Sequence, residues 1–445
     1  MKRSALAVLV AFVTLAAVAA AASSRAPTVA VPQAVKSPAK EVRPLLAVVP
    51  GARGPVLGRA DKRAIWVARR SPKVRLYNSV RAWAFAPEAS AIALATQPEA
   101  SDGGAKLHFV EPWLLSRVAV SRLPWGNVAA LAWGDDRVNV VLQDSGQIEI
   151  VSVDAATHRV SVPAKIDRAL VGSDRAGGRL VLLTAPAHGI GTASLVVIEP
   201  TGVLRSVTLA ETQAGTDAGD KDSPPDFAKM RQNIPALAVE PDAGRAFVIP
   251  ANGSVAEVSL STLAVSYHSL AQPVSLLGRL HDWVEPKAEA KGLTGPVRTA
   301  RWLGSGVVAV TGGDETATVD ASNQVHVSWA PAGLTLIDTN TWGTKLIDRG
   351  ADSFAVDGDS LLVTGSTWSD SDRTGMGLAV YGFDGARKLS VFRGDAARVV
   401  LAFRGKAYVD LGRPYTATVV DLASGRILAD RHAPLARLLI GDGSN

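Results

Sequence analysis

The sequence contains no cysteine, which excludes disulfide bridges, cysteine nucleophiles and thiolate metal sites. Its seven histidines stand apart, and no two have the spacing of a zinc site on one helix or hairpin. A Gly-x-Ser-x-Gly elbow and a Gly-x-x-x-x-Gly-Lys-Ser/Thr phosphate loop are also missing. Because no catalytic signature is present, we expect no catalytic residues and no metal.

The excess of positive over negative charge is small as well. The formal net charge is +6 over 445 residues, and Lys and Arg are scattered without a basic run or an aromatic–basic ladder. Proteins that bind nucleic acid concentrate positive charge on one face or along one element. We therefore expect a protein or small-molecule partner and no nucleic acid, and we expect the chain to be a monomer.

Sustained helical periodicity is missing from residues 60–445, where short apolar runs alternate with turn residues. The clearest unit is a run at 334–338, a turn that starts at Asp338, and a second run at 345–348. An Asp side chain favours such a turn because it accepts hydrogen bonds from backbone groups two residues on. Similar units have their turns at Asp154, Asp384 and Asp421. The sequence thus predicts repeated β-hairpins.

A second hairpin precedes most of these units, with turns such as Phe85-Ala-Pro-Glu88. Two hairpins make four strands, and a period of about 37–46 residues suits one propeller blade. The Ile337-Asp338-x-x-Thr341 turn resembles the YVTN-type β-propeller repeat, and the Phe85 turn resembles WD-like and TolB-like repeats. This resemblance covers residues 60–445 and implies an all-β, single β-propeller of four-stranded blades. The Trp-Asp dipeptide that ends a WD repeat is absent.

The repeat count predicts eight blades, with seven as the alternative if residues 45–77 only decorate a neighbouring blade. The last segment, 435–443, has the pattern of one first strand followed by its turn. We expect strands from the N-terminal region to complete that blade. Pairing of the two chain ends would close the ring and remove the exposed edges of its terminal sheets.

The front of the chain predicts export. Lys2 and Arg3 precede an apolar run, and small residues at Ala20 and Ala22 fit a cleavage signal, so residues 1–22 are interpreted as a signal peptide. A retained membrane anchor is the alternative, because about 18 apolar residues can just span a bilayer. Residues 23–44 form a Pro/Ala-rich linker, and residues 45–445 form the propeller. The expected location is secreted or cell-envelope.

The long segments between predicted strands belong to two kinds of connection that meet on one face of a propeller. Segments 97–105, 185–193, 312–333 and 365–377 join second and third strands, and segments 211–233 and 277–296 join successive blades. Long loops gathered on one face of a rigid scaffold indicate a binding face. Simple tolerance of insertions is the alternative explanation. For segment 312–333 a further alternative is a small hairpin in which Val325 and Val327 pack inward and Trp329 caps an edge.

Polar and aromatic side chains in these segments are the candidate ligand-binding residues, because such groups orient a polar ligand over an apolar platform. They are Asp314, Glu315, Asp320, His326, Trp329, Trp368, Asp370, Asp372, Arg373, His281, Asp282 and Trp283. The stretch from Asp370 to Gly375 resembles the opening of a calcium loop, but Tyr381 stands where the bidentate Glu would be. A solvated polar loop is therefore the preferred interpretation, and calcium is the only cofactor left open.

These patterns favour an exported, non-catalytic propeller that binds a protein or small ligand through the face with the long loops. The alternative is a propeller enzyme of lactonase-like or quinoprotein-like type. Its site would lie at the channel mouth, where carboxylates from separate loops could converge.

Overall fold

A computed structural model describes residues 45–49, 56–60, 77–78, 80–87, 90–97, 104–111, 117–144, 146–217, 230–241, 244–270, 294–319, 325–369, 372–403, 405–411, 418–429 and 438–441. Within these ranges every regular element is a β-strand, which confirms the predicted all-β class. No helix in this part of the chain is long and apolar enough to cross a membrane. The predicted signal peptide and linker lie outside the described residues.

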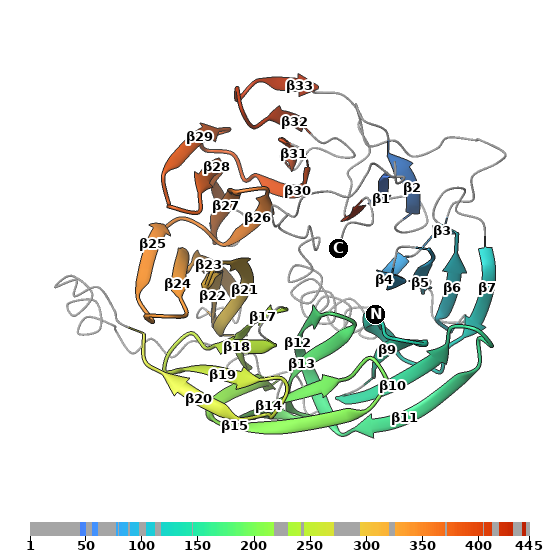
Figure 1. Cartoon of the computed structure of the whole chain (residues 1–445). Coiled ribbons are helices and arrows are strands. Elements are labelled where there is room, and N and C mark those ends of the chain that lie inside the picture. Colours follow the sequence, from blue (N-terminus) through green and yellow to red (C-terminus); the bar gives the residue numbers. More distant parts are fainter. Residues whose placement is uncertain are drawn as a thin grey trace, which may run out of the picture.

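The strands form antiparallel sheets arranged around a common centre (Figure 1). The first four sheets follow the chain and have these strands. The first consists of β4 (Val80–Phe85), β5 (Ile92–Thr96), β6 (Lys106–Val110) and β7 (Arg117–Arg122), and the second of β8 (Asn127–Trp133), β9 (Arg137–Asp144), β10 (Gln147–Asp154) and β11 (Val160–Ile166). The third has five strands: β12 (Arg168–Ala176), β13 (Arg179–Pro186), β14 (Gly189–Ile198), β15 (Leu204–Asp217) and β16 (Arg231–Asn233). The fourth consists of β17 (Ala236–Glu240), β18 (Arg245–Ile249), β19 (Val255–Ser259) and β20 (Val265–His268).

The next sheet has nine strands and consists of two four-stranded units joined by β23 (Val325–Pro331). The units are β21 (Gly295–Gly304), β22 (Val307–Val319), β24 (Leu334–Asp338) and β25 (Thr344–Asp348), then β26 (Ser353–Asp357), β27 (Ser360–Ser369), β28 (Asp372–Gly382) and β29 (Arg387–Val391). A further sheet has β30 (Arg398–Phe403), β31 (Lys406–Asp410), β32 (Thr418–Asp421) and β33 (Ile427–Ala429).

The remaining sheet combines strands from both ends of the chain. It contains β1 (Leu45–Val49), β2 (Val56–Ala60), β3 (Tyr77–Asn78) and β34 (Leu438–Gly441), in the order β3–β2–β1–β34. The contact between the ends is the antiparallel pairing of β1 with β34, which sets Ala47 opposite Leu439.

The sheets are apolar on both faces, because a neighbouring sheet packs against each face. On β9, Val140 and Leu142 pack in the cluster shared with β5 and β6, whereas Val141 packs in the cluster shared with β13 and β14. A strand that is buried on both faces is a continuous apolar run and does not alternate. The burial of five consecutive residues on β9, 138–142, all apolar except Asn139, follows from this packing.

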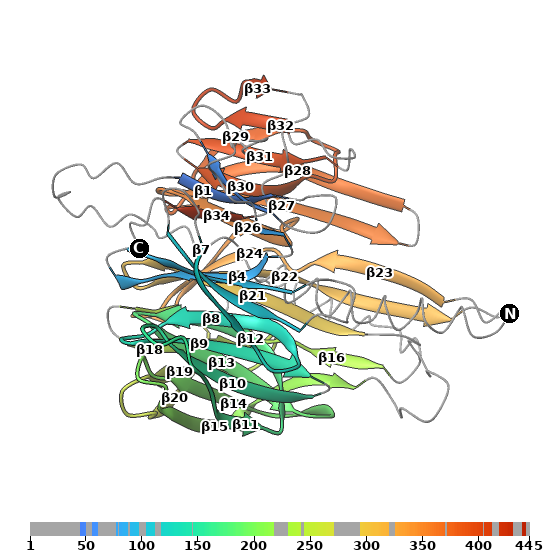
Figure 2. The ribbon, with the colours of Figure 1, turned by 90° about the vertical axis from the view of Figure 1, so that its right-hand side faces the viewer.

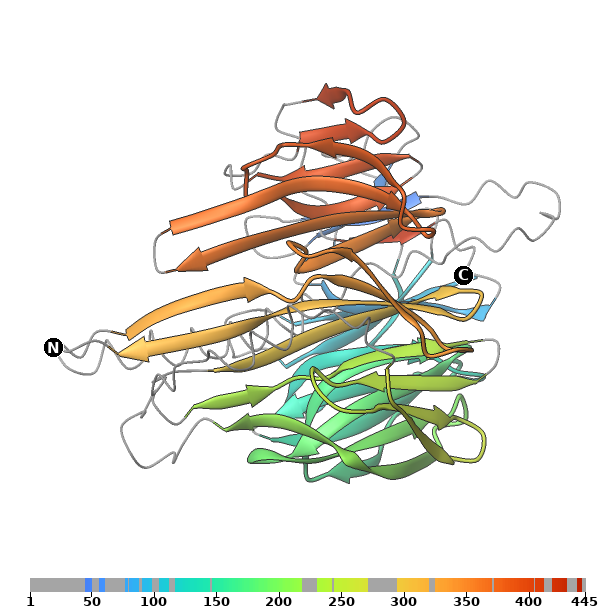
Figure 3. The same cartoon turned by 90° about the vertical axis from the view of Figure 1, so that its left-hand side faces the viewer.

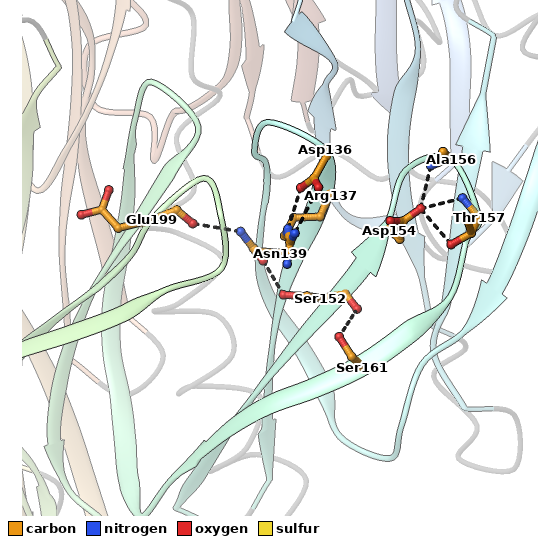
Figure 4. Close-up of polar contacts among 9 residues, drawn as sticks. All are labelled: Asp136, Arg137, Asn139, Ser152, Asp154, Ala156, Thr157, Ser161 and Glu199. Atoms are coloured by element: carbon orange, nitrogen blue, oxygen red, sulfur yellow. Dashed lines mark hydrogen bonds and ion pairs between the residues drawn. The ribbon is translucent and has the colours of Figure 1, made fainter.

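The turn between third and fourth strands has the same bonding in four sheets. In each turn, the carbonyl oxygen of the first turn residue accepts a hydrogen bond at 2.7–2.9 Å. The donor is the backbone N–H of the residue four positions later, and that residue has a positive φ. The donors are His158, Leu263, Trp342 and Gly425. In the first of these turns, Asp154 Oδ1 also accepts the N–H groups of Ala156 and Thr157 at 3.0 and 2.6 Å (Figure 4).

This turn is tied to the other short turn of the same sheet. The Ala155 N–H donates to the Asp136 carbonyl oxygen at 2.8 Å, and the Thr339 N–H donates to the Gly306 carbonyl oxygen at 2.7 Å. Adjacent sheets are joined as well, since the buried Asn139 accepts from the Ser152 hydroxyl and donates to the Glu199 carbonyl oxygen of the next sheet (Figure 4). The turns on this side therefore form a rigid base.

Candidate binding face

The segments 312–333 and 365–377, predicted as loops, are instead the ends of long strands. They form the hairpins β22–β23 and β27–β28, with two short segments, 320–324 and 370–371, outside the described residues. Figures 2 and 3 show both hairpins extending to the same side of the molecule. For segment 312–333 the structure agrees with the alternative of a small hairpin, since the alternation in Val325-His-Val-Ser-Trp329 is typical of paired strands. For segment 365–377 the loop prediction was wrong, because β27 and β28 remain paired through it.

The predicted inter-blade segment 211–233 also contains strand structure. β15 continues to Asp217, and β16 pairs antiparallel with its end through Thr216 opposite Gln232. The end of β15 in turn pairs with the start of β14. A third extended hairpin therefore lies in this part of the chain, and Figure 2 shows β16 on the same side as β23.

These strand ends bond to one another across the boundaries between sheets. β16 lies parallel to the start of β21, where the Gln232 N–H donates to the Thr294 carbonyl oxygen at 3.0 Å. β23 pairs with β27 through Ser328 opposite Ser369 and Trp329 opposite Trp368. The resulting continuous order is β14–β15–β16–β21–β22–β23–β27–β28. We call these strand ends, residues 189–192, 213–217, 231–234, 294–298, 312–319, 325–331, 366–369 and 372–375, the crown sheet.

The register of the crown sheet brings four predicted site residues into one line. Glu315 lies opposite Trp329, Trp329 opposite Trp368, and Trp368 opposite Arg373. Residues directly opposite in paired strands share one face of the sheet. Gln232 joins this line from β16, since its Nε2 donates to Glu315 Oε2 at 3.2 Å. We call Gln232, Glu315, Trp329, Trp368 and Arg373 the crown row.

Two glycines shape the row. Gly295 stands opposite Glu315 on β21 with a φ of 147°, and a Cβ there would overlap the Gln232 carbonyl oxygen. Gly313 lies beneath Trp329, so that a Cβ would overlap Cε2 and Cζ2 of the indole. The first glycine lets β16 approach β21, and the second lets the indole lie against the bare backbone of β22.

Asp352, which no sequence motif indicates, holds the middle of the row in place through hydrogen bonds. Its Oδ2 accepts from the Trp329 indole Nε1 at 3.1 Å and from the Ser366 backbone N–H at 3.0 Å. Burial raises the pKa of the Asp352 carboxyl, and these hydrogen bonds and the Arg373 charge oppose that shift. Arg373 is held nearby, because its Nε and Nη2 both donate to the Ser366 hydroxyl at 3.3 Å.

Glu315 has a similar environment at the other side of Trp329. Burial raises the pKa of the Glu315 carboxyl, and the hydrogen bond from Gln232 acts in the opposite direction. Two carboxyls whose pKa values are raised therefore flank one indole. Each of them is protonated more readily than an ordinary surface carboxyl. A protonated carboxyl can donate a hydrogen bond as well as accept one.

Other predicted residues do not join the row. Asp314 follows Gly313 on β22, belongs to the opposite face, and forms an ion pair with Arg298 at 2.8 Å. His326 lies opposite Thr318 and therefore shares that opposite face. Asp372 is described only by its backbone, which pairs with Ser369. Five candidates lie outside the described residues: Asp320, Asp370, His281, Asp282 and Trp283.

The crown sheet also borders an open pocket of about 420 Å³. Asn233 and Pro296 line it from β16 and β21, Asn252 from the turn after β18, and Ile190 from β14. Its lining combines amide groups with apolar side chains, which is a common composition for small-molecule sites. The pocket and the row thus lie on the same side of the molecule.

The inner strands carry an ionic cluster at the side of the short turns. Arg175 on β12 donates to the carbonyl oxygens of Trp83 and Leu131 at 3.0 and 3.4 Å, and Asp174 accepts the Val239 N–H at 2.9 Å. Burial raises the pKa of the Asp174 carboxyl and lowers the pKa of the Arg175 guanidinium. Because these contacts join β12 to β4, β8 and β17, the cluster holds the inner strands together.

No group of three or more His, Cys, Asp or Glu side chains that could hold a metal ion occurs among the residues that the structure describes. The predicted calcium loop falls on residues 370–375, two of which are outside that part of the chain. Calcium binding there stays an untested hypothesis.

No protein-family model matches the chain, and no curated protein matches it in sequence. Among solved structures, the chain is similar to the dihydro-heme d1 dehydrogenase NirN in complex with DHE, with a TM-score of 0.54, 13% identity, and coverage of 94% of this chain and 78% of that chain. It also resembles AztD from Citrobacter koseri (TM-score 0.48, 11% identity, 90% and 98% covered) and BamB from Moraxella catarrhalis (0.42, 12%, 82% and 92%). At 13% identity the likeness to the first of these structures concerns the fold alone, and it supports a β-propeller.

Proposed function

We propose that this protein is an exported, non-catalytic β-propeller that binds a ligand or protein partner through the side with the crown sheet. The observation that carries the proposal is the assembly of three separate hairpins into one continuous sheet on one side. Propeller blades need only short turns to close, so extended and mutually bonded hairpins on one side are typical of a binding surface on a rigid scaffold.

The same proposal includes eight blades and a closed ring. Counting the nine-stranded sheet as two units supports eight, and the pairing of β1 with β34 supports closure. Export is supported by the sequence of residues 1–22, with a secreted or cell-envelope location. The chain acts as a monomer and has no nucleic-acid partner in this proposal.

A shortened variant tests the binding face. Residues 315–329 are replaced by a two-residue turn, which removes the ends of β22 and β23 and leaves β24 in place. Thermal unfolding of the full chain is measured with soluble sugars, peptides, nucleotides and haem-type cofactors, because a ligand at 100 times its Kd stabilises the folded state by about 2.7 kcal/mol. Ligands that raise the Tm of the full chain should not raise that of the shortened variant.

A substitution on the opposite side serves as the control. Ser424→Lys changes an exposed turn between β32 and β33 and should leave every ligand shift intact. Equal ligand shifts in the full chain and the shortened variant, or their loss in Ser424→Lys alone, would contradict the proposal.

An enzyme with its site at the crown sheet is the second candidate, favoured by the raised pKa values of Glu315 and Asp352. Turnover of any ligand found in the screen decides between the two. An enzyme should lose turnover in Glu315→Gln while it keeps ligand binding, whereas a binding protein shows no turnover in either form.

A further inference from the structure

We infer that the crown row is a binding site for a linear oligosaccharide, with successive sugars lying across successive strands. This inference rests on the proposed function, because it assigns a ligand class to the binding side described above. Four observations lead to it: the composition of the row, the unused hydrogen-bonding atoms, the spacing of the strands, and the pairing of both strand edges.

The composition of the row matches the two surfaces of a sugar. A pyranose ring has apolar C–H faces and an edge of hydroxyl groups. Trp329 and Trp368 lie side by side in the middle of the row and offer large, flat apolar surfaces. Glu315 and Gln232 lie on one side of them and Arg373 on the other, and such planar groups can bind two neighbouring hydroxyls at once.

The side chains of the row are held in place yet keep free bonding atoms. The Trp329 indole is fixed on Gly313 by its hydrogen bond to Asp352 and remains half-buried. The Trp368 indole is also half-buried and has no ring contact or side-chain hydrogen bond among the described residues. Within the same residues, Glu315 Oε1 and Arg373 Nη1 have no partner, although the other ends of both groups are bonded. A pre-positioned group loses little entropy when a ligand binds.

The spacing of the row fits an extended sugar chain. Neighbouring strands lie about 4.8 Å apart, which is close to the length of one pyranose unit. From β16 to β28 the row crosses β21, β22, β23 and β27, so that its length is about 24 Å, or about five sugar units.

The pairing of the strands argues against a strand-like peptide as the ligand. Such a peptide adds to an open sheet edge through its backbone. β22 and β23, which carry Glu315 and Trp329, are paired on both edges at the row. Recognition by this row must therefore use side chains on a face of the sheet, as sugar binding does.

Calorimetric titration of the full chain tests the inference. The probes are linear oligosaccharides of one to six units from three series: β-linked glucose, N-acetylglucosamine and galacturonic acid. For one series we expect affinity to rise with each added sugar up to about five units and then to level off. Tryptophan fluorescence should change in the same titration.

Three variants localise the binding. Trp368→Ala should weaken the affinity about tenfold or more, since this indole is a central aromatic anchor. Trp329→Phe should weaken it less, because the flat ring remains. The matched control is Trp125→Ala, which removes an indole that is 65% exposed between β7 and β8 and should leave affinity unchanged. Thermal unfolding of each variant without sugar verifies folding.

The possible outcomes are distinct. If a series binds with equal affinity to Trp368→Ala and the full chain, the inference is overturned. If none of the three series binds the full chain, the inference also fails. The proposed function is then still tested separately, by the shortened variant with the other ligand classes. A peptide whose binding is lost in Trp368→Ala would support the proposed function and overturn the sugar assignment.

Discussion

At the scale of single residues, the carboxyls fall into two groups with opposite pH dependence. The turn residues Asp154, Asp338 and Asp421 accept hydrogen bonds from backbone N–H groups and side-chain hydroxyls, with the Ser424 hydroxyl the largest cause at Asp421, and these bonds hold the pKa of each carboxyl below its ordinary value. Glu315 and Asp352 are partly buried in the crown sheet, and burial raises the pKa of each carboxyl. The ionised form therefore stabilises the turns and is disfavoured in the crown.

The turn carboxyls should make the fold acid-sensitive. The folded-state pKa of Asp154 is lowered, so its contribution to the free energy of unfolding is present above the unfolded pKa of about 3.9 and is lost as pH falls through the folded value. Asp154→Asn should be less stable than the native chain at pH 7, and the difference should vanish in strong acid. Urea unfolding between pH 2 and pH 7 measures it, and a difference that grows on acidification would contradict the assignment.

Asp352 should behave in the opposite way. Because its folded-state pKa is raised, the stability of the native chain relative to Asp352→Asn should fall as pH rises from about 3.9 through the folded value. The Asn variant keeps an acceptor for the Trp329 and Ser366 N–H groups. Asp352→Ala removes the acceptor of both N–H groups and should lower the free energy of unfolding by about 1–3 kcal/mol. Urea unfolding of both variants across this pH range checks the sign, and a parallel pH profile for the native chain and Asp352→Asn would refute it.

At the scale of elements, local chemistry explains what the sequence predicted well. The Asp338 turn was identified from its own residues, and as expected the Asp338 side chain accepts the backbone N–H two residues on, that of Asn340, at 2.8 Å. Two crown hairpins were placed on one side correctly. The first was also considered as a small hairpin because its Val residues alternate, whereas the second was described only as a loop. The register of Trp329 with Trp368 was beyond prediction, because it joins strands from two sheets whose relative positions no local pattern encodes. Asp352 was missed for the same reason.

The joint between β16 and β21 should depend on a glycine. Gly295→Ala places a Cβ against the Gln232 carbonyl oxygen and also strains a backbone with a φ of 147°. We expect a loss of about 1–3 kcal/mol in the free energy of unfolding and a weaker joint between the two strands. Denaturant unfolding measures the first effect, and hydrogen exchange at the Gln232 and Ile234 amides measures the second.

The matched control for this joint lies at the other end of the same strand. Gly304 has a φ of 95°, but a Cβ there meets no atom within 4 Å. Gly304→Ala should therefore show only the cost of backbone strain and unchanged exchange at residues 232 and 234. Equal exchange in the two variants would show that the clash at Gly295 is not what limits the joint.

At the scale of the whole molecule, the sheets are held together by different means on the two sides. On the short-turn side, the side chains of Asp174 and Arg175 on β12 bind backbone groups of β4, β8 and β17 and so join four inner strands. On the other side, the crown sheet joins sheets through backbone ladders. A scaffold fixed on both sides can present the crown row with little reorganisation, which favours binding by a preformed site. Closure by the chain ends would complete this rigidity.

Closure can be tested with a single engineered disulfide, because the chain has no cysteine of its own. Ala47 and Leu439 lie directly opposite in the pairing of β1 with β34, and opposite residues of antiparallel strands are close enough for a disulfide. Ala47→Cys/Leu439→Cys should oxidise within one chain, run faster on a non-reducing gel, and raise the free energy of unfolding by about 2–4 kcal/mol, which reduction abolishes. The control Ala47→Cys/Leu428→Cys places the second thiol on β33, in a different sheet, and should stay reduced. Efficient oxidation of the control, or none in the test pair, would place the two chain ends elsewhere and rule out a ring closed by these strands.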